Sequence, residues 1–213
     1  MMSIREKLSV EEIANSLTHG LGLLLSLAGF AFLVTLAALN GGRWHIASSI
    51  VYGASLVILY AASTCYHGTT SPKLKQKLQV VDHCCIYLLI AGSYTPFALV
   101  VLGGAFGTGL LAFVWAFALF GIAMKLIFRG RYNAAGVVSY LAMGWVGIIA
   151  VQPLYLALGA VPLALILAGG ISYSLGVIFF GWHSIRHHHA IWHVFVLGGS
   201  IFHFLAVAIY VMP

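Results

Sequence analysis

Four ionisable residues that lie far apart in the sequence could together bind a metal ion. His189 and His193 are one helical turn apart, so their imidazoles would project from the same face of a helix. His67 and Asp82 lie at the ends of two other apolar segments, and we expect all four residues to reach one depth in a membrane. Three histidines that leave one coordination position open to water form a catalytic zinc site. The residue types and their placement therefore predict a Zn2+ site.

Each of these residues also has a more ordinary explanation. His-x-x-x-His arises often by chance, and His187 and His188 make the run resemble a solvated basic loop. Position 190 is alanine, so the HExxH motif of soluble zinc proteases is absent. Asp82 is the only acidic residue beyond the N-terminal segment, and it could face lipid headgroups. A buried acid at this place would instead need a cation, a hydrogen-bond donor or a metal.

A second set of polar residues could support such a site. Ser63 lies one turn before His67, where its hydroxyl could hold a water or orient a ligand. His203 follows His193 by about three turns on roughly the same face, and a hydrogen bond between helices is its more ordinary role. A polar stripe at the start of the first apolar segment comprises Glu12, Asn15, Thr18 and His19. The stripe fits either helix capping with interfacial solvation or a hydrogen-bond network that braces the site.

The elements that must position these residues are apolar helices. The chain has 213 residues, of which 62% are hydrophobic and 7% charged, whereas soluble domains carry about 25% charged residues. This composition predicts an all-α, multi-pass membrane protein with one domain over residues 1–213, including a short N-terminal segment of about residues 1–12. The loops are too short for a second domain. The basic residues are scattered over loops, which argues against nucleic acid as a partner.

Seven segments have the length of about 20 residues that a bilayer requires. Pro96 lies inside the third segment and should kink it. The expected spans are residues 13–39, 44–67, 80–102, 107–128, 134–158, 163–182 and 190–212.

The basic residues predict the orientation of these spans. Arg43 alone lies on one side of the membrane. The other nine lie on the opposite side, at Arg5, Lys7, Lys73, Lys75, Lys77, Lys125, Arg129, Arg131 and Arg186. Because cytoplasmic loops carry an excess of lysine and arginine, we expect the N-terminus inside and the C-terminus outside.

Several of these motifs, in this order, resemble the hemolysin III family, the bacterial branch of the progestin and adiponectin receptor superfamily. The motifs are Glu12-x-x-Asn15-x-x-Thr18-His19, Ser63-x-x-x-His67, VVDHCCIYLLIAGSYTPF with Asp82, and His189-Ala-Ile-Trp-His193. The resemblance covers the whole chain. It implies a seven-helix bundle in the bacterial inner membrane, with zinc held near the cytoplasmic face by His67, His189 and His193. It also implies that Asp82 contacts the metal through a bound water.

The resemblance further implies a role in membrane lipid homeostasis. The superfamily includes alkaline ceramidases, which suggests hydrolysis of a lipid amide or ester, with Asp82 as the proton acceptor. Membrane lipids, such as an acyl lipid or a ceramide-like ligand, are then the expected partners. One alternative is a receptor or regulator in which zinc is structural, and the histidines do not separate it from an enzyme. A pore-forming cytolysin has little support, because the spans contain one acidic residue and no charged ring.

Overall fold

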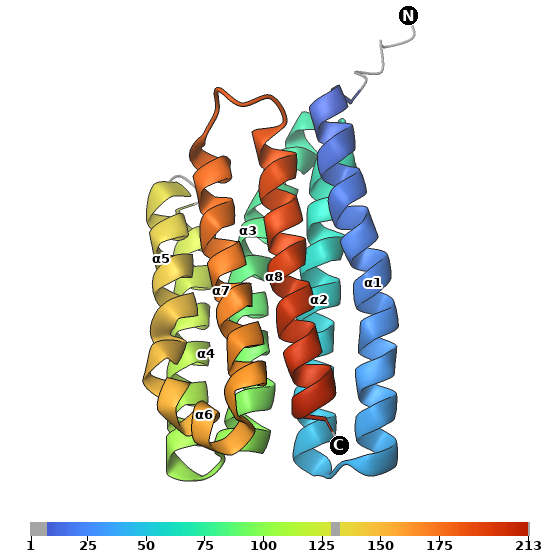
Figure 1. Cartoon of the computed structure of the whole chain (residues 1–213). Helices are drawn as coiled ribbons and strands as arrows, with labels where there is room; N and C mark the ends of the chain where they lie inside the picture. Colours follow the sequence, from blue (N-terminus) through green and yellow to red (C-terminus); the bar gives the residue numbers. More distant parts are fainter. Residues whose placement is uncertain (1–7, 129–132, 213) are drawn as a thin grey trace, which may run out of the picture.

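The computed structural model describes residues 8–128 and 133–212. In this part of the chain, seven helical segments are long and apolar enough to cross a membrane, as the sequence predicted. They stand side by side as an upright bundle, in which α1 begins at one end and α8 finishes at the other (Figure 1). The helices are α1 (Val10–Asn40), α2 (Arg43–Gly68), α3 (Pro72–Pro96), η1 (Phe97–Leu102), α4 (Gly104–Ile127), α5 (Asn133–Trp145), η2 (Val146–Ala150), α6 (Val151–Leu158), α7 (Ala160–Gly181) and α8 (His188–Tyr210).

Helix α3 starts about two turns earlier than the predicted span. Residues 73–77, which we expected to form a polar loop, belong to its first turns. Pro72 occupies the start of the helix, where its missing N–H and fixed φ are favourable. The lysines and glutamine that follow are good helix formers, although hydropathy alone excludes them from a membrane span. The extension brings Lys75 close to the end of α2 and the start of α1.

Two spans are interrupted within the bundle. Pro96 ends α3, and the chain continues as the π-helix η1, because proline removes a backbone donor and distorts the helical turn. The span that begins with α5 changes to the 3-10 helix η2 and resumes as α6. The Tyr94 hydroxyl lies at this second interruption, where it bonds to the Gly144 carbonyl at 2.6 Å and accepts from the Gly147 N–H at 2.8 Å. The side chain thereby satisfies backbone groups that the broken helix releases.

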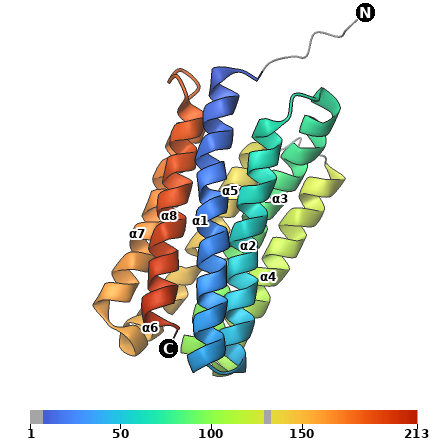
Figure 2. The ribbon, with the colours of Figure 1, turned by 90° about the vertical axis from the view of Figure 1, so that its right-hand side faces the viewer.

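Close packing of α1, α2 and α3 aligns the polar residues at one end of the bundle. Gly22 on α1 lies directly against the Tyr60 ring on α2, and Gly92 on α3 lies against Ser55 on α2. A side chain at either glycine would collide with its neighbour, so the small residue permits the close approach. Figure 2 shows α1 between α2 and α8. These contacts place the start of α1, the end of α2 and the start of α8 next to one another.

The described basic residues are distributed as the topology prediction requires. Helix α2 begins with Arg43 at the end of the bundle opposite to the start of α1. Four residues used in that prediction, Arg5, Lys7, Arg129 and Arg131, lie outside the described residues. The assignment of the two ends to the inside and outside of the cell stays a prediction.

Candidate metal centre

The three predicted metal ligands meet where α2 ends and α8 begins. His67 lies in the last turn of α2, and His189 and His193 lie in the first two turns of α8. One ring nitrogen of each residue lies within 4.8 Å of the corresponding nitrogen of the other two. His67 and His193 are almost completely buried, with 2% and 0% of the residue surface exposed. The cluster is therefore a compact group of two buried imidazoles and one that is half-buried, His189.

Hydrogen bonds orient two of the three imidazoles toward the centre of the cluster. His67 Nδ1 lies 2.7 Å from Glu12 Oε2, and His193 Nδ1 lies 3.2 Å from the carbonyl oxygen of Asn15 and 3.1 Å from Thr18 Oγ1. A carbonyl oxygen can only accept, so His193 Nδ1 carries the proton and its Nε2 keeps a free lone pair. The carboxylate of Glu12 favours the same tautomer of His67.

The remaining nitrogen atoms of these two rings are buried without a partner. Nε2 of His67 and Nε2 of His193 form no hydrogen bond with any described residue. Leaving a buried polar atom unpaired costs about 1–3 kcal/mol, so two such atoms in one cluster call for a ligand. Neutral imidazoles with an anchored Nδ1 and a free Nε2 are suited to bind a metal ion.

Glu12 is itself fixed by a neighbouring helix. Its Oε2 lies 3.0 Å from Nζ of Lys75 on α3, and its backbone N–H donates to the Ser9 hydroxyl that caps α1. The sequence interpretation used Lys75 only as a marker of membrane orientation and missed this contact. The available signal in the sequence was Pro72, because proline is favoured at the start of a helix and would place Lys75 in the first turn.

His19 and Ser63 form a second layer beneath the cluster. The His19 ring is stacked on that of His193, with ring centres 3.4 Å apart and an angle of 15° between the planes. His19 Nδ1 lies 2.7 Å from Ser63 Oγ, and the Ser63 hydroxyl also faces the carboxylate of Asp82. Contacts therefore run without a break from His193 through His19 and Ser63 to Asp82.

Asp82 lies beside the three histidines but outside their group. It is buried on α3, with 4% of its surface exposed. No ion pair within residues 8–128 and 133–212 includes it, and no oxygen of Asp82 belongs to the metal-binding group. A buried carboxylate without a cation is unfavourable unless another group stabilises it. Its connection to the clustered histidines runs through Ser63 and His19.

The structure separates other histidines from the cluster. His203 bonds through Nε2 to the Ile166 carbonyl on α7 at 3.0 Å, deep in the bundle and away from the polar stripe of α1. His188 Nδ1 lies 3.0 Å from the carbonyl oxygen of Phe179, and its Nε2 lies 3.9 Å from Glu11. His187 caps α8 in a left-handed conformation with φ of 58°. Neither His187 nor His188 belongs to the group of potential ligands among the described residues.

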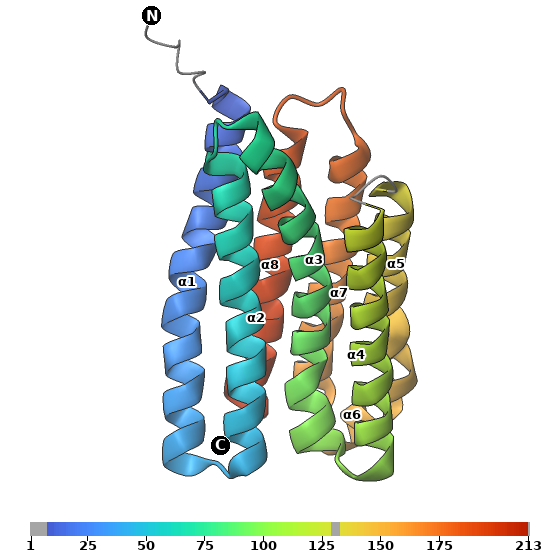
Figure 3. The same cartoon turned by 180° about the vertical axis from the view of Figure 1, so that it is seen from behind.

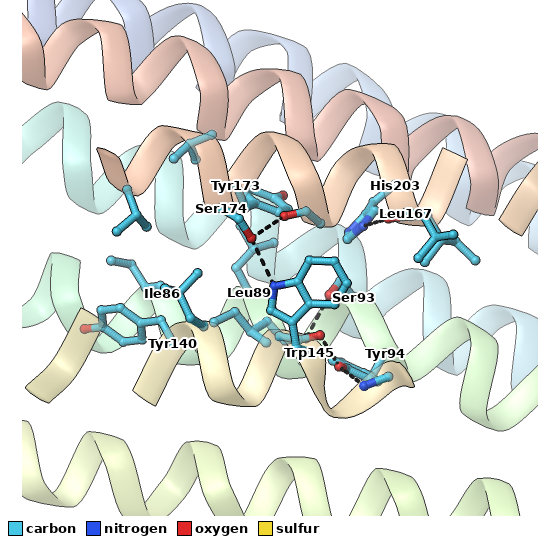
Figure 4. Close-up of a pocket in the computed structure, with 18 of the residues that line it drawn as sticks. Ile86, Leu89, Ser93, Tyr94, Tyr140, Trp145, Leu167, Tyr173, Ser174 and His203 are labelled. Carbon is cyan, nitrogen blue, oxygen red and sulfur yellow. Dashed lines mark hydrogen bonds between the residues drawn. The ribbon is translucent and has the colours of Figure 1, made fainter. Parts of the chain in front are cut away.

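An apolar cavity of about 450 Å3 starts beside this second layer. Figure 4 shows it between the helices, with Tyr140 and Ile86 toward one end, Trp145 near the middle and His203 toward the other. His19, Asp82 and His83 contribute polar groups to the lining, which is otherwise mostly aliphatic and aromatic. A cavity of this size and character fits a small apolar molecule or an acyl chain.

Comparison with known proteins identifies the relatives of the chain. The sequence profile described as "Haemolysin-III related" matches residues 8–204. The chain belongs to this family. It is 48% identical over 200 residues to the hemolysin-3 homolog of Bacillus subtilis, covering 94% of each chain. It is 45% identical over 203 residues to hemolysin-3 of Bacillus cereus, covering 95% of this chain and 93% of that protein.

A more distant relative is found in animals. The human monocyte to macrophage differentiation factor is 30% identical over 205 residues, which cover 92% of this chain and 83% of that protein. The match supports the wider superfamily that the sequence motifs suggested. Together with the seven apolar helices, family membership makes this chain a multi-pass protein of the bacterial cell membrane.

Proposed function

We propose that this haemolysin III protein binds zinc and uses it to hydrolyse an amide or ester bond of a membrane lipid, as part of membrane lipid homeostasis. One observation carries the zinc proposal. His67 and His193 have their Nδ1 atoms anchored, while their buried Nε2 atoms lie unpaired beside His189.

The donor set fits zinc. Imidazole nitrogen is a preferred ligand of zinc, and three protein ligands rather than four are typical of catalytic sites, which keep one position open. Bound zinc would lower the pKa of a coordinated water to about 7 and polarise an acyl carbonyl. Glu12, Thr18 and the Asn15 carbonyl would hold the imidazoles in place for this purpose.

Asp82 is the residue best placed to move protons. In hydrolysis, water adds to the acyl carbon, the bond to the nitrogen or oxygen of the leaving group breaks, and the leaving group takes up a proton. We assign both transfers to Asp82, which would accept the proton of the attacking water and then donate it. Ser63 would orient the carboxylate, because its hydroxyl faces Asp82 and also contacts His19.

The apolar cavity supports a lipid as the substrate. It begins at Asp82 and His19 and continues along the bundle, so an acyl chain inside it would present its carbonyl end to the polar groups. We further propose, from the distribution of lysine and arginine, that this end of the bundle faces the cytoplasm.

Turnover of labelled ceramide-like and acyl-lipid substrates by the purified protein in detergent tests the hydrolase proposal. Asp82→Asn keeps the size of the side chain but removes the base, so activity should fall by about 100-fold or more while zinc content is retained. Glu11→Gln, the same chemical change at a half-exposed acid of the same end, should keep full activity.

Two results would contradict the proposal. Undiminished turnover by a zinc-loaded Asp82→Asn protein would exclude this residue as the base. A zinc-loaded wild-type protein that hydrolyses no substrate in a broad lipid panel would favour a receptor or regulator in which zinc is structural.

A further inference from the structure

Lys125 is a buried cation that the proposed chemistry does not use. It lies in the last turn of α4, and only 6% of its surface is exposed. The other described lysines and arginines are exposed or half-buried, as basic residues near membrane surfaces usually are. Lysine at the end of a helix often extends its ammonium group to water or interacts with the helix dipole. The burial of Lys125 indicates a different environment.

Within residues 8–128 and 133–212, Lys125 has no counter-ion. The chain contains four acidic residues, of which Glu6 lies outside the described residues. Glu11 and Glu12 lie on α1, whereas α4 packs against α3, η1 and α5. Figure 3 shows α4 beside α3 and α5, on the far side of the bundle from α1. Asp82 forms no ion pair with any lysine of the described segments.

The ammonium group lies among groups that face the apolar cavity. Lys125, His83 and Tyr140 all line it, at the end that also contains Asp82. Lys125 Nζ lies 5.9 Å from the centre of the Tyr140 ring and packs directly over Gly136, where an added Cβ would lie 2.6 Å from Nζ. The Tyr140 hydroxyl donates to the His83 carbonyl at 2.8 Å. Nδ1 of His83 is buried and has no partner in the described chain.

We propose that Lys125 and His83 form an anion-binding subsite at this end of the cavity, which holds the carboxylate or phosphate head of a lipid whose tail fills the apolar part. Three independent observations on the described residues support this subsite: a buried cation without a counter-ion, a neighbouring imidazole nitrogen without a partner, and an adjoining cavity of about 450 Å3 with an apolar lining. An anion would pair with the Lys125 ammonium group and with the His83 imidazole, and a hydrocarbon tail would fill the cavity. None of the three clustered histidines lines the cavity, so the subsite does not depend on zinc.

Binding of palmitate and of its uncharged methyl ester to the full-length protein in a non-ionic detergent tests the subsite. A hydrogen bond to a charged group contributes enough free energy for about tenfold in affinity, so the wild type should prefer palmitate by about this factor. Lys125→Met should abolish the preference and leave binding of the ester unchanged. Lys77→Met removes an exposed lysine at the same end of the bundle and should keep the preference.

A second variant tests the position of the charge without removing it. Gly136→Ala places a methyl group where the ammonium group now lies, so it should displace Lys125 and reduce the preference for palmitate. This variant also decides the outcome if Lys125→Met does not fold. The same measurements on metal-depleted protein should give the same preference, which separates this inference from the zinc and hydrolase proposals.

Competitors identify the source of the anion. Displacement of palmitate by phosphatidylglycerol, but not by phosphatidylcholine, would assign the subsite to a phospholipid headgroup and support the proposal. Displacement by inorganic phosphate at the same concentration would show that no tail is needed and would overturn it. Equal affinity of the wild type for palmitate and its ester, or a wild-type preference in folded Lys125→Met, would also overturn it.

Discussion

Removing the carboxylate that anchors His67 should weaken zinc binding without removing a ligand. Glu12 Oε2 accepts a charge-assisted hydrogen bond from His67 at 2.7 Å, and the imidazole side chain is only 3% exposed. Hydrogen bonds to charged groups contribute about 1.5–3 kcal/mol, which corresponds to roughly 10–100-fold in affinity. Changes in the residues that support metal ligands typically have the same effect, about 10–100-fold.

The partial exposure of Glu12 places the more conservative variant at the lower end of this range of zinc affinities. Its side chain is 26% exposed and shares its charge with Lys75, so solvent and the lysine weaken its hold on the histidine. Glu12→Gln keeps an oxygen that can accept the hydrogen bond, and we expect zinc affinity to fall by about tenfold. Glu12→Ala removes the acceptor and also the ion-pair partner of Lys75, so the loss of zinc affinity should approach the upper end, about 100-fold.

The assay is competition for zinc between the purified protein and a chelator of known affinity. Glu11→Gln is the matched control, because Glu11 is the neighbouring acid and lies 3.9 Å from His188, which is outside the cluster. Its zinc affinity should stay within about twofold of the wild type. Metal-free Glu12→Gln should unfold at a slightly lower temperature than metal-free wild type, because its ion pair with Lys75 is also lost. Wild-type zinc affinity in Glu12→Ala would refute the role of Glu12.

Two further predictions concern packing and topology. Gly22→Ala should destabilise the protein by about 1–3 kcal/mol, because the new methyl group collides with the Tyr60 ring. Thermal unfolding in detergent measures this loss of stability. The control is Gly109→Ala, which should have little effect because there is open space around the new atom. The lysine and arginine distribution predicts a C-terminus outside the cytoplasm, so an alkaline phosphatase fused there should be active and a fluorescent protein fused there should be dark. The reverse pair of signals would contradict this orientation.

The seven-span architecture could be predicted from the sequence because apolar length determines it almost alone. The starts and interruptions of the helices were harder to predict. Hydropathy indicates which residues can lie in lipid, not where a helix begins, so the polar first turns of α3 were interpreted as a loop. The change from α5 to η2 has no proline at its start and depends on Tyr94, which reaches it from another helix. No local sequence pattern reports a contact of that kind.

In the candidate site, too, the sequence predicts some features and not others. Helical spacing and depth were sufficient to group His67, His189 and His193, because side chains at the ends of packed helices must share a level. The anchoring of individual nitrogen atoms could not be predicted, because it depends on side-chain rotamers and on the rotation of α1 against α2 and α8. The burial of Lys125 was missed for a similar reason, since it requires Gly136 on α5 to lie directly beneath the ammonium group.

Zinc content of the purified protein tests the central claim most directly. We expect about one zinc ion per wild-type chain, and loss of it in His67→Ala, His189→Ala and His193→Ala, because each change removes one of three converging nitrogen atoms. His187→Ala and His188→Ala should retain zinc, since neither residue belongs to the cluster. Full zinc content in all three cluster variants, or loss of zinc from a folded His187→Ala or His188→Ala protein, would contradict the assignment of the metal site.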